Sequence, residues 1–185
     1  MLKNDDSNYG WVSIILHWLM AVSIFAMFGL GLWMVDLTYY DAWYHRAPDL
    51  HKSVGMLLLF LLIFRFIWRL MNIRPALAGL WWEKMLALAV HRLHYLLLFA
   101  LLLSGYLIPT AEGAGIDVFG WFTAPATFNF DKQQADFIGK AHWLLAWAVM
   151  ALAGLHSAAA IKHHVVDRDN TLLRMLGVRK THKEA

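Results

Sequence analysis

Histidines inside uncharged stretches are the residues of this chain best suited to chemistry. Of ten histidines in 185 residues, His17, His142 and His156 lie in stretches without Asp, Glu, Lys or Arg, and His51 lies near the start of another apolar stretch. Taken singly, each could be an interfacial residue or an interhelical hydrogen-bond partner. Ionisable groups in apolar spans nevertheless mark functional sites by default, and neutral imidazole is a good ligand for haem iron.

The four histidines fall at two depths. His142 and His156 are 14 residues apart, so on a helix they share a face, offset by about 40°, and lie about 21 Å apart along the axis. His17 should lie level with His156, and His51 level with His142, because successive spans run in opposite directions. Two pairs, each shared by two helices, suit two six-coordinate haems, which favours electron transfer over oxygen binding. Cysteine is absent, so haem would be held non-covalently.

Other residues near the inner level keep several roles open. His91 and His94 could be ligands of the inner haem, proton-handling groups, partners of a haem propionate or interfacial residues. Arg65 and Arg69 could reach the lipid surface or pair with a propionate. Small residues near the proposed ligands leave room for a macrocycle or allow close helix packing. They are Gly55 and Gly154.

Four apolar spans must position these side chains. Hydrophobic residues make up 60% of the chain and charged residues 16%, which excludes an ordinary soluble domain. The uncharged stretches from Ser7 to Val35 and between Lys140 and Lys162 are each long enough to cross a hydrocarbon core of about 30 Å. We expect an all-α fold, an integral membrane four-helix bundle in one domain over residues 1–185. The expected spans are about 11–34, 52–70, 85–109 and 140–162, with a short basic tail at 163–185.

Basic residues divide unevenly between the two ends of the expected bundle. Twelve of sixteen Lys and Arg residues fall on one side, with five from Arg65 to Arg92, six from Lys162 onward, and Lys3. The other side carries four basic residues against seven acidic ones. By the positive-inside rule, both termini should be cytoplasmic. A basic tail of this kind is typical of lipid-headgroup contact, so we expect no nucleic-acid partner.

The outer end combines positive charge with a long connection. Arg46, Lys52 and Lys140 lie there, and two of them are within two residues of the proposed outer ligands. A cationic opening above the outer haem would attract a small anion, although contact with lipid or a propionate is an equal alternative. Residues 110–138 form a long, aromatic-rich connection, in which we expect a short helix lying over the outer haem.

Four motifs carry a resemblance to a known family. The most specific is G-L-H-S-A-A-A-I-K-H-H at residues 154–164, followed by D-N-T-L-L-R-M at residues 169–175. The I-L-H-W-L at residues 15–19 and the H-R-L-H at residues 91–94 also match. On these motifs the chain resembles, over nearly its whole length, the bacterial cytochrome b561 family, four-helix di-haem proteins that include the superoxide oxidases.

The resemblance implies two haem b groups and a reaction. It implies that one iron is held by His17 with His156 and the other by His51 with His142, and that the histidines of the third helix are not iron ligands. Similar members oxidise superoxide at the periplasmic face of the bacterial inner membrane and pass the electrons to ubiquinone near the cytoplasmic face. The catalytic candidates are then the outer cations Arg46, Lys52 and Lys140. The quinone-binding candidates are His163, His164 and Lys84.

Two other functions compete with that expectation. The first is a cytochrome b subunit that relays electrons between quinone and a partner dehydrogenase or reductase. The second is a His-rich metal transporter, which is disfavoured because no carboxylate lies inside an expected span. The expected partners are ubiquinone, superoxide and the lipid bilayer. A homo-oligomer and a complex with an electron-transfer partner protein both stay open.

Overall fold

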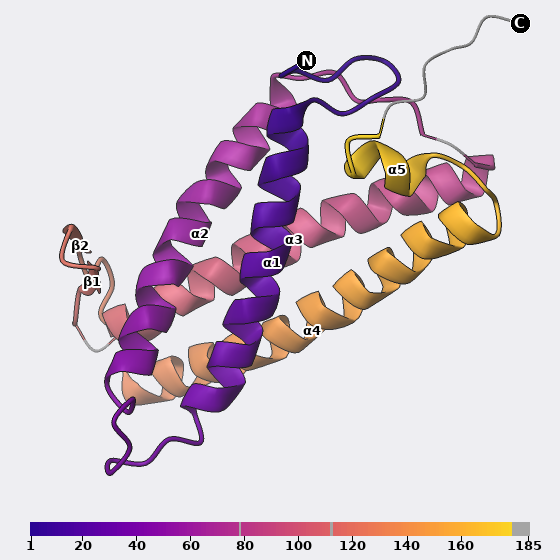
Figure 1. Cartoon of the computed structure of the whole chain (residues 1–185). Helices are drawn as coiled ribbons and strands as arrows, with labels where there is room; N and C mark the ends of the chain where they lie inside the picture. The colour runs from indigo at the N-terminus through magenta and orange to yellow at the C-terminus, as the bar shows by residue number, and fades with distance from the viewer. Residues whose placement is uncertain (78, 112, 179–185) are drawn as a thin grey trace, which may run out of the picture.

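Four long helices dominate the chain. The computed structural model describes residues 1–77, 79–111 and 113–178 (Figure 1). The long helices are α1 (Trp11–Met34), α2 (Arg46–Leu70), α3 (Trp81–Ala111) and α4 (Lys132–Val165). Each is long and apolar enough to cross a membrane. This mostly helical architecture with four candidate spans is the one predicted from composition. Of the expected basic tail, residues 179–185 lie outside the described residues.

Three of the helices begin earlier than the hydropathy suggested. The expected starts at 52, 85 and 140 become Arg46, Trp81 and Lys132. At α4 the reason is a capping box in which the Asp131 carboxylate accepts the backbone N–H of Gln134 at 2.8 Å, while the Gln134 side chain accepts that of Asp131 at 3.1 Å. With 34 residues, α4 is about 51 Å long and extends beyond a hydrocarbon core of about 30 Å.

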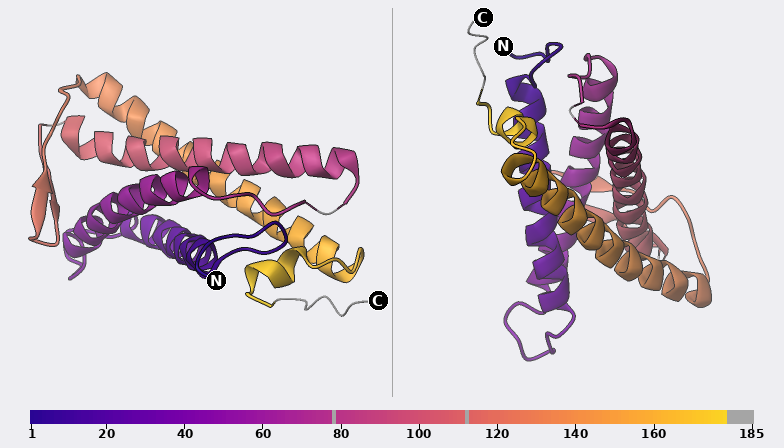
Figure 2. Two further views of the ribbon diagram at one scale, coloured as in Figure 1. Left: turned by 90° about the horizontal axis from the view of Figure 1, so that it is seen from above. Right: turned by 90° about the vertical axis from the view of Figure 1, so that its right-hand side faces the viewer.

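A buried apolar core lies halfway along the bundle. Each long helix packs beside the next in sequence, and α4 runs obliquely across the others (Figure 2). All four helices contribute to the core, and the contribution of α4 is Val149, which is seven residues from both His142 and His156. The members are Met20, Ile24, Met27, Leu58, Leu62, Leu98, Leu101, Leu102 and Val149. The core therefore separates the two histidine levels.

The expected short helix in the 110–138 connection was wrong. The described part of this segment instead contains an antiparallel hairpin of β1 (Ile116–Val118) and β2 (Phe122–Ala124), the one departure from an all-α fold in the described residues. Its turn places Phe119 and Gly120 at positive φ, as tight hairpins require. Ile116 and Val118 are buried against α2, and the Ser53 hydroxyl donates to the carbonyl of Asp117 at 3.0 Å.

The opposite end of the bundle is closed by a short C-terminal helix. This helix, α5 (Thr171–Met175), lies beside the end of α4, close to the N-terminal segment (Figure 1). The indole of Trp18 donates to the last carbonyl of α5 at 2.7 Å. The Arg174 guanidinium donates to the carbonyls of Ser7 at 3.0 Å and Ala76 at 2.9 Å. One short helix thus joins α1, the N-terminal segment and the α2–α3 connection.

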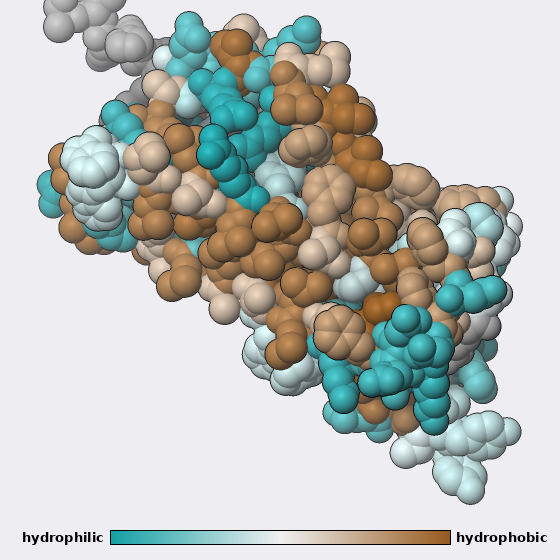
Figure 3. All heavy atoms as spheres, turned by 180° about the vertical axis from the view of Figure 1, so that it is seen from behind, coloured by the Kyte–Doolittle hydropathy of each residue, from teal (hydrophilic) through white to brown (hydrophobic). Residues whose placement is uncertain are grey.

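The outer surface of the bundle is apolar between two polar ends. Figure 3 shows brown, apolar surface through the middle of the molecule and teal, hydrophilic groups toward both ends. Large apolar side chains in mid-helix are exposed, among them Val22, Phe25, Leu96 and Leu155. In water such a surface would be unfavourable, whereas acyl chains cover it without cost. The chain therefore has the surface of a multi-pass membrane protein.

Candidate functional site

Two pairs of half-buried histidines face each other across the bundle. The ring centroids of His17 in α1 and His156 in α4 are 6.2 Å apart, with 62° between the ring planes. Those of His51 in α2 and His142 in α4 are 6.3 Å apart, with an angle of 76°. The structure thus brings together the same pairs that the depth argument joined, one pair on each side of the buried core.

The separation within each pair fits two imidazoles on opposite sides of one metal. A metal–imidazole bond of about 2.0 Å on each side, with each ring centre roughly 1.2 Å beyond its nitrogen, places the centroids about 6.4 Å apart. Both pairs match this value. His91 and His94 of α3 also lie near His156, but their centroids are only 5.5 and 5.3 Å from it. Distance therefore favours His17 as the partner of His156.

The surroundings of His142 hold its ring in the form that binds metal. Its Nδ1 lies 3.1 Å from the carbonyl oxygen of Leu101 and 3.0 Å from the hydroxyl of Ser104, both in α3. A backbone carbonyl only accepts, so it selects the tautomer with the proton on Nδ1. The lone pair is then on Nε2, and an outer hydrogen bond of this kind is typical of metal-ligating histidines.

Two glycines that the sequence did not single out pack against the outer pair. A Cβ added to Gly105 would lie 3.0 Å from Cε1 of His142, and one added to Gly31 would lie 3.2 Å from Cε1 of His51. Gly55 and Gly154 have open space where a Cβ would stand, which agrees with the expectation that they leave room for a macrocycle rather than with close helix packing. Sequence reasoning missed Gly31 and Gly105 because their neighbours are on other helices.

An apolar cavity adjoins the outer pair. It is lined by side chains of all four long helices and by Ile116 of the hairpin, together with His51, His142 and Lys52. Lys52 therefore borders the cavity of the outer pair, and its ammonium forms an ion pair with the exposed carboxylate of Asp49 at 2.8 Å. Arg46 and Lys140 are exposed at the same end of the bundle.

The outer end carries negative charge close to its cations, in line with the seven acidic residues on this side. One carboxylate, Asp49, already offsets the charge of Lys52. In the α1–α2 connection, the backbone N–H and hydroxyl of Thr38 lower the pKa of the Asp41 carboxyl, which keeps a second negative charge at this end. Any attraction for an anion here depends on a balance between fixed charges of both signs.

The inner pair has a cationic neighbour. The guanidinium of Arg65, in α2, lies 3.0 Å from Nδ1 of His17 and 5.6 Å from the ring centre of Tyr95 in α3. The guanidinium of Arg69, one turn further along α2, lies 4.8 Å from the same ring centre. His94 has its Nδ1 2.9 Å from the carbonyl oxygen of Val90.

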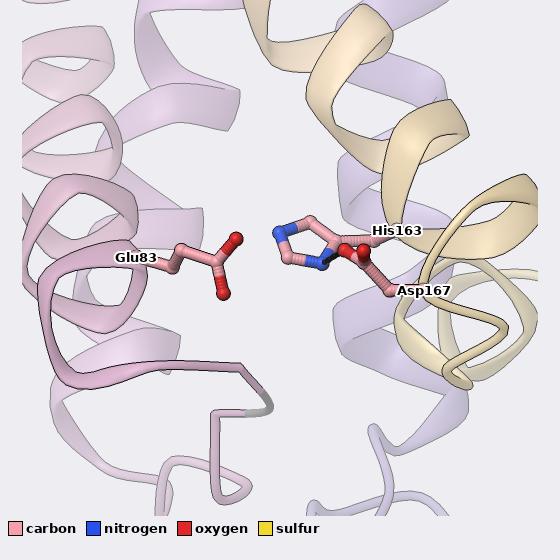
Figure 4. A group of neighbouring side chains, drawn as sticks. All are labelled: Glu83, His163 and Asp167. Atoms are coloured by element: carbon pink, nitrogen blue, oxygen red, sulfur yellow. Dashed lines mark ion pairs between the residues drawn. The ribbon is translucent and has the colours of Figure 1, made fainter.

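A network of ionisable groups joins α3 to the end of α4. Figure 4 shows Glu83 of α3 opposite His163 and Asp167, and candidate ligand atoms of these three residues all lie within 4.8 Å of one another. The Lys162 ammonium, however, lies 2.9 Å from Glu83 and 2.8 Å from Asp167. The Lys162 ammonium already pairs with both carboxylates, so the group fits an ion-pair network better than a metal site.

His163 belongs to this network. Its Nδ1 lies 2.8 Å from Asp167 and 3.2 Å from Asp169. His164 is half-buried, and Lys84 is exposed next to Glu83 in sequence. In the described part of the chain neither of these two residues joins the network, so the structure groups His163 with carboxylates rather than with the other two quinone candidates.

Comparison with known proteins identifies the family. The family model described as prokaryotic cytochrome b561 matches residues 8–178. The chain belongs to this cytochrome b561 family. It is 49% identical over 176 residues to cytochrome b561 homolog 2 of Escherichia coli, covering 94% of each chain. It is also 33% identical over 172 residues to the probable superoxide oxidase CybB of Yersinia pestis, covering 91% of this chain and 95% of that protein.

Membership gives the cofactor class and the general role. The protein is a membrane cytochrome b, so b-type haem is its cofactor and electron transfer its role. The distance between the rings in each histidine pair suits ligation of one haem iron. The hydrogen bond of His142 also favours the tautomer whose Nε2 can bind a metal. A shorter match, 30% identical over 99 residues, joins 54% of this chain to cytochrome b561 homolog 1 of Escherichia coli. Membership of a cytochrome family therefore favours electron transfer over metal transport.

Proposed function

We propose that this cytochrome b561 takes electrons from superoxide at its outer end and delivers them to ubiquinone at its inner end. The observation that carries the proposal is the presence of two histidine pairs with equal spacing, one on each side of the core. The likeness to a protein named probable superoxide oxidase supports the choice of electron donor. The protein would then be an oxidoreductase in a bacterial inner membrane.

Two b-type haems would be held by the two pairs. His17 with His156 would bind the inner haem, and His51 with His142 the outer haem. Bound haem supplies one-electron redox chemistry at each level, and four imidazole ligands leave no iron position open to oxygen. His91 and His94 would then border the inner site without holding the haem, because their rings are closer to His156 than two imidazoles bound to one metal would be.

The outer cations serve the reaction by concentrating an anion. Superoxide carries one negative charge, and the exposed Arg46 and Lys140 raise its local concentration, together with Lys52, whose charge Asp49 partly offsets. Superoxide loses one electron and leaves as oxygen, so it needs no binding site that holds a product. The hairpin supplies Ile116 to the wall of the same cavity.

The inner end must supply protons as well as electrons. Reduction of one ubiquinone takes the electrons of two superoxide anions and two protons, giving ubiquinol. His163, His164 and Lys84 are the quinone-binding candidates, and of these His163 lies in the network with Asp167, Lys162 and Glu83. Imidazole next to carboxylate is suited to proton transfer near neutral pH.

The charge distribution supports the orientation. The end with the histidine–carboxylate network also carries the N-terminal segment, α5 and most of the basic residues of the described chain (Figure 1). Basic loops stay in the cytoplasm, so both termini should be cytoplasmic and the hairpin periplasmic. The quinone end would then face the proton supply of the cytoplasm.

The test follows electrons from one end to the other. The detergent-purified protein is assayed for haem per chain by pyridine haemochrome and then exposed to a superoxide generator, with and without a ubiquinone analogue. We expect two haems per chain, their reduction by superoxide and their reoxidation by quinone. Superoxide dismutase added beforehand should abolish the reduction. Haems that exchange electrons with quinone but ignore superoxide would overturn the choice of donor.

A second function is favoured by one specific observation. The relative with 49% identity carries a name that states no donor, whereas the relative named for superoxide has 33% identity. A cytochrome b subunit that relays electrons between quinone and a dehydrogenase or reductase fits the same haem sites. Mild-detergent co-purification of a stoichiometric second polypeptide, together with no response to superoxide, would favour this function.

A further inference from the structure

Arg65 is a cation inside a membrane-spanning helix with an unusual partner. It is half-buried on α2, and its Nη2 donates to Nδ1 of His17 at 3.0 Å. In the described part of the chain no carboxylate lies within 4 Å of its guanidinium, and the inner acids Glu83 and Asp167 are paired with Lys162. A charge at this depth is costly unless an anion pairs with it.

The hydrogen bond to His17 cannot persist when His17 binds iron. Guanidinium has only donors, so Nδ1 of His17 must accept, and the ring proton is then on Nε2. Iron bound through Nε2 requires the other tautomer, with the proton on Nδ1. The two arrangements exclude each other, so Arg65 loses its neutral partner in the haem-bound protein and its charge stays next to the inner site.

We propose that Arg65 binds a propionate of the inner haem, an inference that rests on the proposed role of His17 as a ligand. A guanidinium forms two parallel hydrogen bonds with a carboxylate, which a propionate offers and the chain around Arg65 does not. Tyr95 supports this position, because its ring lies 5.6 Å from the guanidinium and helps to orient it. Arg65 is therefore a positioning residue that also sets the electron affinity of the inner haem.

The reduction equilibrium tests the assignment without relying on activity. Reduction adds one negative charge at the iron, so a nearby cation favours the reduced form. Arg65→Gln should lower the reduction equilibrium constant of one haem by roughly two- to thirtyfold, as expected for a unit charge about 8 Å away at an effective dielectric constant between about 80 and 20. Spectroelectrochemical titration of the purified holoprotein measures this shift, and the other haem should keep its parent value.

Two further variants make the result specific. Arg65→Lys keeps the positive charge, so the reduction equilibrium constant should stay close to that of the parent protein. If Arg65→Gln loses the inner haem altogether, the supporting result is that Arg65→Lys still holds two haems. Arg69→Gln, one turn away on the same helix, is the matched control and should shift the equilibrium less. Equal shifts in Arg65→Gln and Arg69→Gln would mean a diffuse field rather than a contact, and would overturn the proposal.

The anion could instead be a lipid phosphate, and the medium distinguishes the two sources. A propionate contact predicts the same shift for Arg65→Gln in phospholipid-free detergent and in nanodiscs with anionic lipid. A shift seen only in anionic nanodiscs would assign Arg65 to the lipid surface and overturn the proposal. The role of His17 is checked separately, since His17→Ala should lose one haem. Retention of both haems there would contradict the ligand assignment itself.

Discussion

The two ends of the bundle hold histidine pairs of equal spacing in opposite surroundings. At the outer end, His142 is fixed by a carbonyl and a hydroxyl, glycines lie against both rings, and a hairpin packs over the site. At the inner end, the pair is bordered by a guanidinium and two more histidines. The outer site is defined by shape and the inner site by charge. A shaped site suits the end where a small anion would donate electrons, and a charged site suits the end where quinone would take up electrons and protons.

Loss of a ligand should have the largest effect, at either end. His142→Ala should reduce haem from two per chain to one and abolish electron transfer from superoxide to quinone, because the outer haem would lose one of the two histidines proposed to hold it. Pyridine haemochrome analysis of the purified variant measures the haem. His45→Ala is the control, since His45 is exposed six residues before His51. Two haems in His142→Ala would contradict the pairing.

Crowding the outer rings should have the next largest effect. Gly105→Ala and Gly31→Ala place a methyl group 3.0 and 3.2 Å from ring carbons of His142 and His51. We expect a loss of about 1–3 kcal/mol in stability, typical of overpacking, and a lower occupancy of the outer haem. Thermal unfolding followed by Soret absorbance measures the first quantity.

Gly29→Ala is the matched control for both glycine variants. Gly29 lies on the same helix as Gly31, two residues earlier, but no atom lies within 4 Å of the position of an added Cβ. Alanine there should be neutral or slightly stabilising, since it favours helix over glycine by about 1 kcal/mol. If Gly31→Ala and Gly29→Ala behave alike, the outer site is not defined by shape.

This contrast marks the limit of what the sequence could predict. Spacing of 14 residues was enough to place His142 and His156 on one face at two depths, because helix geometry is fixed by the backbone alone. The contact of Gly105 with His142 depends on how closely α3 approaches α4, and no local pattern encodes that distance. The role of Arg65 likewise depends on the approach of α2 to α1.

The hairpin and the start of α4 were missed although both left local signals. Ile116 and Val118 alternate with a polar residue and precede a turn with Gly120, a pattern typical of a hairpin. The expectation of a helix there rested on loop length rather than on this alternation. Asp131 followed by Gln134 three residues later is a capping-box signature. The first turns of α4 are polar, so a search for apolar stretches did not include them in the span.

Loosening the hairpin should have a smaller effect than crowding the rings. Ser53→Ala removes the hydrogen bond to the Asp117 carbonyl and should cost about 0.5–1.5 kcal/mol, the usual net value of one such bond. We expect faster protease cleavage within the hairpin and unchanged haem content. Ser157→Ala is the control, because the Ser157 hydroxyl is exposed and donates within its own helix. Equal cleavage in both variants would mean that Ser53 does not hold the hairpin.

The inner network should be the least sensitive to a single change. Glu83→Gln removes one carboxylate, but Lys162 keeps Asp167 as its partner at 2.8 Å, and the pair is accessible to solvent. We expect a small decrease in Tm that nearly disappears at about 1 M salt, where the Debye length falls to about 3 Å. A salt-independent decrease as large as that of Gly105→Ala would show that the inner end, too, is held together by packing, and the contrast between the two ends would fail.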